Sequence, residues 1–228
     1  MRKDFLVALF IVALAGCNSP LVPKGDDDDA KKDVSVHVTT KDPLQLLSDA
    51  KYSLDNMAFK ELAPVFEDGH ITGFGMAIYQ MPLISPTVED GFFQTTINLK
   101  AGSAGSLYFN LDSDAEGTLK DALRIELYQE SVNKAVIYSY EGGESITEAE
   151  ADLNADGQPG KDMNGETIMY TNGAHSYMTK KFNQSAFSNL NENEEISLRA
   201  TIFFDGFQTN TESFTKNINK LDLSFELK

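Results

Sequence analysis

The residues best suited to chemistry lie in one acidic segment, which reads DLNADGQPGKD over positions 152–162. Oxygen-bearing side chains stand at its first, third and fifth places, as Asp152, Asn154 and Asp156, and a glycine follows at the sixth. Alternate side chains of such a loop point inward, and glycine permits the sharp turn with which the loop surrounds a calcium ion. Gln158 would add its backbone carbonyl, and Asp162 is the nearest carboxylate that follows. These five residues are the predicted metal ligands, with Ca²⁺ as the cofactor.

The twelfth place of this loop holds Met163, where a calcium-sensing loop carries a bidentate glutamate. In this respect the segment resembles the calcium loops of dockerins and thrombospondin-type repeats. The predicted role of the ion is to stiffen an extracellular loop and stabilise the fold. The alternative is a turn that binds no metal, because asparagine, aspartate and glycine favour tight turns in any case.

Patterns for catalysis are weak. His37, His70 and His175 lie in different predicted segments, and the chain contains no HExxH pattern for a zinc helix. Ser131 and Lys134 match SxxK, but that pattern requires the serine at a helix start, whereas Ser131 falls in a predicted turn and no KTG follows. We therefore assign no catalytic residue and expect a protein that is not an enzyme. A buried pair of carboxylates with raised pKa at the end of a sheet would favour a hydrolase instead.

The start of the chain carries an export signal. Two basic residues precede an eleven-residue apolar run, which is too short for a permanent membrane span and ends in small residues. The following sequence, LAGC, contains Cys17, the only cysteine of the chain. This sequence resembles the lipobox of bacterial lipoproteins, which implies cleavage before Cys17 and its modification with lipid chains such as palmitate. An ordinary signal peptide followed by a chance cysteine is the alternative.

The predicted organisation has three parts: a signal peptide over 1–16, the lipidated Cys17 with an acidic flexible tether over 17–33, and a β-sandwich domain over 34–228. The tether contains four consecutive aspartates and breaks in regular structure at proline and glycine. These features predict a protein anchored on the extracytoplasmic face of the cell membrane. Asn18 stands where Gram-negative lipoproteins kept in the inner membrane carry aspartate, so a Gram-negative host would place the protein in its outer membrane.

Composition supports a folded, acidic domain. The 228 residues are 41% hydrophobic and 24% charged, with 35 acidic and 19 basic residues and a net charge of −16. This balance argues against a nucleic-acid partner, because such proteins carry a basic surface. The predicted partners are the membrane, through the lipid anchor, and a protein or cell-wall component.

Beyond position 33, short runs of alternating apolar and polar residues recur between glycine, asparagine and aspartate. Such alternation is typical of strands with one buried and one solvated face. Eight or more strands of this kind predict a mainly β fold, an antiparallel β-sandwich of jelly-roll type. The clearest predicted strands cover 34–39, 95–99, 106–111, 123–128, 134–139, 195–204 and 221–227. Segments 123–128 and 134–139 are expected to pair across a short polar turn.

One or two short helices are expected within this β domain. The first covers about 43–59, where Leu44, Leu47, Tyr52 and Leu54 form a helical stripe, and the second is a single turn in 144–153. Strand alternation also predicts that Phe203 and Phe225 share one buried face, with the neighbouring phenylalanines in loops.

The order of strands over 95–228 resembles that of the TasA and camelysin group of Gram-positive surface proteins. This resemblance implies a secreted jelly-roll sandwich; the group includes matrix-fibre subunits and a branch described as a metalloprotease. Fibre subunits of the group carry a signal without a lipobox, so the LAGC sequence argues against polymerisation. The preferred interpretation is a lipid-anchored surface protein with a non-enzymatic interaction or matrix role. A binding component for a ligand or polysaccharide within a larger surface system is the alternative, and a hydrolase comes third.

Overall fold

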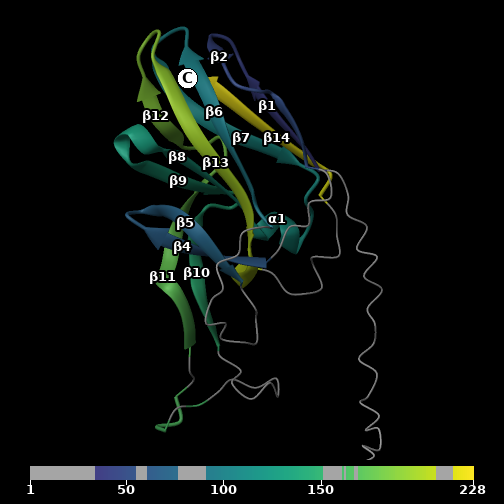
Figure 1. Cartoon of the computed structure of the whole chain (residues 1–228), viewed down its shortest axis with the longest axis vertical. Helices are drawn as coiled ribbons and strands as arrows, with labels where there is room; N and C mark the ends of the chain where they lie inside the picture. Colours follow the sequence, from purple (N-terminus) through teal and green to yellow (C-terminus); the bar gives the residue numbers. More distant parts are fainter. Residues whose placement is uncertain are drawn as a thin grey trace, which may run out of the picture. The chain divides into compact units, whose positions relative to one another are not determined.

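In the computed structural model, two β-sheets pack face to face and account for most of the described residues, which are 34–54, 61–76, 91–150, 161, 163–166, 169–208 and 218–228. The five-stranded sheet has the order β12-β7-β14-β1-β3 (Figure 1). Its strands are β1 (Val34–Thr40), β3 (Lys51–Leu54), β7 (Gly105–Ser113), β12 (Ala186–Leu190) and β14 (Lys220–Leu227). The mainly β fold with a sandwich-like arrangement is thus confirmed.

The nine-stranded sheet has the order β10-β11-β9-β8-β13-β4-β5, with β6 paired to β13 and β2 paired to β6. Its strands are β2 (Leu44–Leu46), β4 (Glu61–Glu67), β5 (His70–Met76), β6 (Phe93–Ala101), β8 (Leu123–Gln129), β9 (Lys134–Ser139), β10 (Gly143–Glu150), β11 (Met169–Lys181) and β13 (Glu195–Asp205). The short helical elements are α1 (Thr118–Ala122), η1 (Glu130–Val132) and η2 (Gly206–Gln208). No helix of the described residues is long and apolar enough to cross a membrane.

Not every strand pair is antiparallel. The pairs β1–β14, β9–β11 and β4–β13 are parallel, so the sheets are mixed. The predicted pair 123–128 and 134–139 is confirmed as the antiparallel pair β8–β9, and η1 with Asn133 in the left-handed region forms its turn. Strand β1 lies between β14 and β3, which buries Val34, Val36 and Val38 on one face. The apolar–polar alternation of the sequence therefore predicts correctly which side chains of β1 are buried.

The helix expected over 43–59 is wrong over the described part of that range. Residues 44–46 form β2 and pair with β6, while residues 51–54 form β3 and pair with β1. Leu47, part of the expected helical stripe, is 51% exposed. Long partner strands provide ladder hydrogen bonds that an isolated helix of weak amphipathicity does not match. The helical turn expected in 144–153 is also wrong, since residues 143–150 form β10 along β11.

Two apolar cores lie on opposite faces of the nine-stranded sheet. The inter-sheet core fills the space between the sheets and contains Phe109, Phe204 and Phe225, all fully buried. The hairpin core lies under the β4–β5 hairpin and consists of Leu62, Ile71, Phe74, Ile137, Tyr177 and Phe203, with Phe66 and Phe92 packed against it. Phe203 and Phe225 thus belong to different cores, and Phe204, the last residue of the predicted strand 195–204, lies in the inter-sheet core with Phe225. The single-face expectation was wrong because β13 is buried on both faces.

The β4–β5 hairpin follows from a local signal. Asp68 and Gly69 connect its strands, with φ of 50° and 82°. A two-residue turn with positive φ at both places is the type I′ geometry, for which Asp-Gly is a preferred sequence. The apolar residues on either side pack into the hairpin core, and the hairpin lies next to β8 and β9 (Figure 1).

Candidate functional site

The outer face of the nine-stranded sheet carries an unusual set of buried polar side chains. Residues on β8 and β13 alternate between the inter-sheet core and this outer face. The cross-strand pairs Tyr128–Arg199, Glu126–Thr201 and Arg124–Phe203 lie along it. The β4–β5 hairpin covers part of this face and leaves the part along β6 open.

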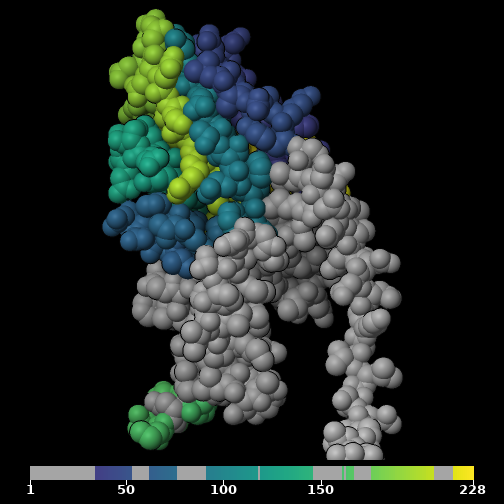
Figure 2. All heavy atoms as spheres, in the orientation of Figure 1, coloured from purple at the N-terminus to yellow at the C-terminus, as the bar shows by residue number. Residues whose placement is uncertain are grey.

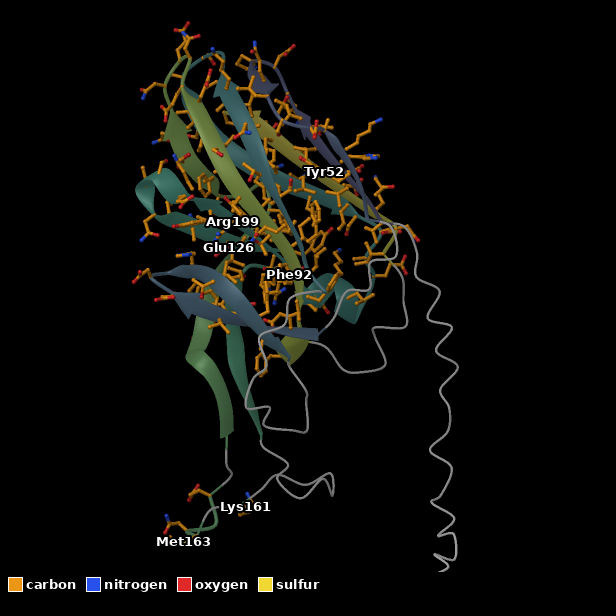
Figure 3. All side chains as sticks on the ribbon, in the orientation of Figure 1. Tyr52, Phe92, Glu126, Lys161, Met163 and Arg199 are labelled. Atoms are coloured by element: carbon orange, nitrogen blue, oxygen red, sulfur yellow. The ribbon has the colours of Figure 1, made fainter. Side chains whose placement is uncertain are left out.

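One residue of the hairpin is held by two of these side chains. The backbone N–H of Ile71 donates to Oε1 of Glu126 at 2.7 Å. The Ile71 carbonyl accepts from Nη2 of Arg199 at 3.3 Å. Figure 3 shows Glu126 and Arg199 on neighbouring strands next to the hairpin. We call this arrangement the Ile71 clamp. It provides side-chain partners for both backbone polar groups of a residue on the outermost strand, where ladder partners are missing on one side.

Glu126 is a buried acid of this face with a strongly perturbed pKa. Its side chain is 0% exposed, and its second oxygen, Oε2, has no hydrogen-bond partner among the described residues. Burial raises the pKa of Glu126 to about 7, against the opposing effects of the Ile71 N–H and the Arg199 charge. Desolvation therefore outweighs both favourable contacts. Near neutral pH this carboxyl group exists in both protonation states.

Tyr128 connects the clamp to the hairpin turn. The ring of His70 stacks on the ring of Tyr128 at 4.2 Å between centroids, with 7° between their planes. The Arg199 guanidinium carbon lies 4.7 Å from the same ring centroid, which is cation–π distance. The Tyr128 hydroxyl donates to Asn133 Oδ1 at 3.1 Å, and the Asn133 amide reaches the carbonyl of Asp68 at 3.4 Å. These contacts hold the tip of the hairpin against β8 and η1.

A second buried carboxylate lies further along β13. Asp205 is fully buried, and its two oxygens accept from the Tyr177 hydroxyl at 2.5 Å and from the Phe207 backbone N–H at 3.0 Å. Burial raises the pKa of Asp205, and burial together with the Asp205 charge raises that of Tyr177. Arg124 donates to Ser145 Oγ at 3.1 Å and to backbone carbonyls nearby. This cluster joins β8, β10, β11 and β13, which is a structural role.

Beside the clamp, the outer face is hollowed. An open hollow of about 400 Å³ is lined by Thr96, Tyr128, Glu130, Ser131, Ser197 and Arg199. A second hollow of about 320 Å³ shares Ser197 and continues past Asn98 and Glu195 to Leu47. The exposed Thr96 and Ser197 stand on β6 and β13, which lie open on the face in Figure 2. Hydroxyl groups, one tyrosine and one arginine suit a polar ligand or a polar protein surface.

The predicted site residues fall largely outside the described residues. Cys17 and all five calcium ligands, Asp152, Asn154, Asp156, Gln158 and Asp162, lie there. The loop that contains the five ligands connects β10 to β11, whose last described pair is Glu150 with Met169. The described residues hold no group of three acidic, histidine or cysteine side chains suited to a metal. The calcium site and the lipid anchor remain predictions.

The histidines lie in separate strands. His37 is on β1 in the five-stranded sheet, where its Nδ1 is 3.2 Å from Asp222 Oδ1. His70 is on β5 in the nine-stranded sheet, against Tyr128. The backbone of His175 belongs to β11, and its side chain is outside the described residues. Ser131 of the SxxK match accepts from Gln129 at 3.3 Å, whereas the Lys134 ammonium lies 5.1 Å from the Phe187 ring centroid.

Sequence reasoning missed Glu126, Asp205 and the Ile71 clamp. Alternation along 123–128 places Glu126 on the side expected to face solvent, and the hairpin that covers this side was not among the predicted strands. The missed signal is Asp68-Gly69 between two apolar segments, a strong hairpin indication.

Comparison of the chain with models of protein families, with curated proteins and with solved structures finds no match in any of the three. The lipobox and the resemblance to the TasA and camelysin group therefore stay predictions from sequence.

Proposed function

We propose that the chain is a lipid-anchored surface protein with a non-enzymatic interaction role. The sequence LAGC around Cys17 supports the anchor, and the acidic segment after it supports a spacer between membrane and domain. The observation that carries the interaction role is the open, hydroxyl-lined hollow beside the Ile71 clamp. Two of its lining residues, Arg199 and Tyr128, also contact the hairpin through Ile71 and His70.

The anchor is tested by the variant Cys17→Ala. Without the thiol no lipid can be attached, so the variant is expected in the medium or as an uncleaved precursor, while the wild-type chain sediments with membranes. Cell fractionation with immunoblotting provides the measurement. A variant that matures and sediments like the wild type would contradict the anchor.

The binding surface is tested by site-specific photo-crosslinking in intact cells. A benzophenone amino acid at Ser197, in both hollows, is expected to give discrete adducts. The same group at Asp112, on the five-stranded sheet with a side chain 72% exposed, is the matched control and is expected to give few. Equal adduct yields from the two positions would remove the hollow from the proposal.

A second candidate is a ligand-binding component for a polysaccharide, favoured by the hydroxyl groups of Thr96, Ser131 and Ser197 around one hollow. In that case the group attached at position 197 would be carbohydrate and would stay on the crosslinked peptide after protease treatment, whereas an attached protein partner would be degraded to peptides. A third candidate is a hydrolase, favoured by Glu126 as a buried acid of raised pKa next to the hollow.

A further inference from the structure

The tip of the β4–β5 hairpin is attached to the neighbouring strands through side chains. The ladder contact of the hairpin with β13 consists of two parallel pairs, Phe204–Glu61 and Asp205–Leu62. Nearer its tip, the hairpin is held to β8, β13 and the η1 turn by side chains: the Ile71 clamp, the His70–Tyr128 stack and the Asn133–Asp68 hydrogen bond. An element attached in this way can separate while the ladders of the sheet stay intact.

The central contact of this attachment contains Glu126, whose carboxylate has too few hydrogen-bond donors to stabilise its negative charge. Oε1 of Glu126 is occupied by the Ile71 N–H, and Oε2 is buried without a partner among the described residues. A carboxylate taken from water needs several donors to offset its lost hydration. Here one backbone N–H and one arginine at Coulombic range do not suffice. Any conformation that lets water reach Oε2 is therefore favoured when Glu126 ionises.

We propose that the β4–β5 hairpin is a flap that stays closed over the outer face of β8 and β13 while Glu126 is protonated and opens when Glu126 ionises. In the closed state the flap covers Ile137 and Phe203 of the hairpin core. Opening exposes these apolar side chains and frees Nη2 of Arg199 from the Ile71 carbonyl. Since Arg199 also lines the hollow, opening extends the hollow into a larger surface with an apolar part. The flap operates whether or not the hollow is the binding surface.

Other charged and titratable groups lie on the flap and on the elements packed against it. They are Arg124 and Tyr128 on β8, Arg199 and Asp205 on β13, His70 on β5, and Tyr177 on β11. Asp205 accepts two hydrogen bonds, and its Tyr177 contact binds β13 to β11, away from the flap. His70 belongs to the flap contact itself, since its ring stacks on Tyr128, and histidine is the residue type that most often serves as a pH-sensitive switch. It therefore needs its own control.

Proton linkage sets the size of the effect. In the open flap Glu126 has the ordinary pKa of 4.5, and in the closed flap its pKa is about 7. Between about pH 5 and about pH 8 the equilibrium constant for opening then rises roughly 70-fold. The rise levels off above about pH 7, where Glu126 is ionised in both states.

Hydrogen exchange of the full-length chain measures this opening. After correction for the intrinsic pH dependence of exchange, amides of residues 61–76 are expected to lose protection by roughly 70-fold over this range, while amides of β8 and β9 keep theirs. In Glu126→Gln the loss should disappear, because glutamine carries no titrating charge. The matched control Glu195→Gln removes an exposed carboxylate of the same face and should behave like the wild type. His70→Phe, which keeps an aromatic ring on Tyr128, should also retain the pH dependence.

The wild-type result alone decides the proposal if Glu126→Gln does not fold. Hairpin protection that is equal at both pH values overturns it, and so does a loss that β8 and β9 share. A loss that persists in Glu126→Gln, or vanishes in His70→Phe, assigns the titration to another group and overturns it as well. Carbon-13 titration of the Glu126 carboxyl group in the wild-type chain adds an independent measurement: its midpoint must lie close to neutral, well above 4.5.

Discussion

The inter-sheet core and the hairpin core share the nine-stranded sheet, and they differ in that buried carboxyl groups lie beside the hairpin core. Between the sheets, rings pack on rings: Phe109 lies 5.0 Å from Phe225 and 5.2 Å from Tyr138 between centroids. Under the hairpin, apolar side chains share the sheet face with Glu126, Asp205 and Arg124, all buried. Apolar burial is insensitive to pH, whereas a buried acid links stability to proton concentration. The raised pKa of Glu126 therefore links the hairpin-core face of this sheet, and not the inter-sheet face, to proton concentration.

The largest expected effect comes from truncating one buried phenylalanine in each core and comparing the two variants. Phe109→Ala removes a fully buried ring from the inter-sheet core and should lower the free energy of unfolding by about 3–5 kcal/mol. Phe74→Ala makes the same change in the hairpin core, where Phe74 packs on Phe92 and Phe203. Denaturant unfolding should report the first loss in full. Hydrogen exchange should report the second mainly as lost protection of the hairpin. Two variants with the same global loss would show that the cores unfold as one unit.

The next effect concerns pH and the hairpin core. Because folding raises the pKa of Glu126 from 4.5 to about 7, the folded state binds the proton more tightly than the unfolded state. The stability contributed by this group is therefore present below about pH 4.5 and is lost as pH rises to about 7. The total is about 3 kcal/mol. Glu126→Gln should lack this loss and exceed the wild type in stability above about pH 7. Chemical denaturation of both proteins at several pH values measures the difference between their free energies of unfolding. The other carboxylates contribute equally to both proteins, so their contributions cancel in this difference. Parallel curves for the two proteins would show that Glu126 is not buried as a charge.

Calcium is expected to stabilise the strands that pack beside the hairpin core. The predicted loop connects β10 and β11, and these strands carry Ser145 and Tyr177 of the Asp205 cluster. A ligand that binds only the folded state stabilises it by about 2.7 kcal/mol at about 100 times its dissociation constant. Melting temperature should therefore rise in millimolar calcium relative to EDTA, and Asp156→Ala should abolish the rise. Glu192→Gln, an acid in another turn, is the control. Identical melting curves with and without calcium would favour the turn that binds no metal.

The sequence predicts the strands of the inter-sheet core better than it predicts the short strands that depend on distant pairing. Alternation over 34–39 and 221–227 marks the strands that line the inter-sheet core, because each has one apolar and one polar face. The two short strands in 43–59 escape this pattern, since they exist only through pairing with β6 and β1. Local composition carries little information on such distant pairing.

The candidate site was less predictable than the fold. Glu126 sits on the polar side of its strand, as alternation requires, so nothing within 123–128 distinguishes it from a solvated acid. Its burial depends on a hairpin that begins about sixty residues earlier and on the register that places Arg199 diagonally across from it. Both are long-range properties. A pattern search can find the Asp-Gly turn, but it cannot assign the face that the hairpin covers.

The smallest expected effect concerns two tyrosine hydroxyl groups near the hairpin. One donates a buried hydrogen bond, and the other donates to an exposed side chain, so their contributions to the free energy of unfolding should differ. Tyr177→Phe removes the hydroxyl that donates to Asp205 Oδ2, and it leaves a buried acceptor without that donor. The cost should be about 1–3 kcal/mol in the free energy of unfolding. Tyr128→Phe is the matched control, since its hydroxyl donates to the exposed Asn133, where water can replace it, and should cost less than about 1 kcal/mol. Urea unfolding of the three proteins at one pH supplies both values.

The stability lost in Tyr177→Phe should be smaller at low pH, because a protonated Asp205 carries no charge for the hydroxyl to stabilise. The stability lost in Tyr128→Phe should not change with pH. Equal losses at every pH would mean that Asp205 is hydrated in the folded chain, and the contrast between the two cores would then rest on Glu126 alone.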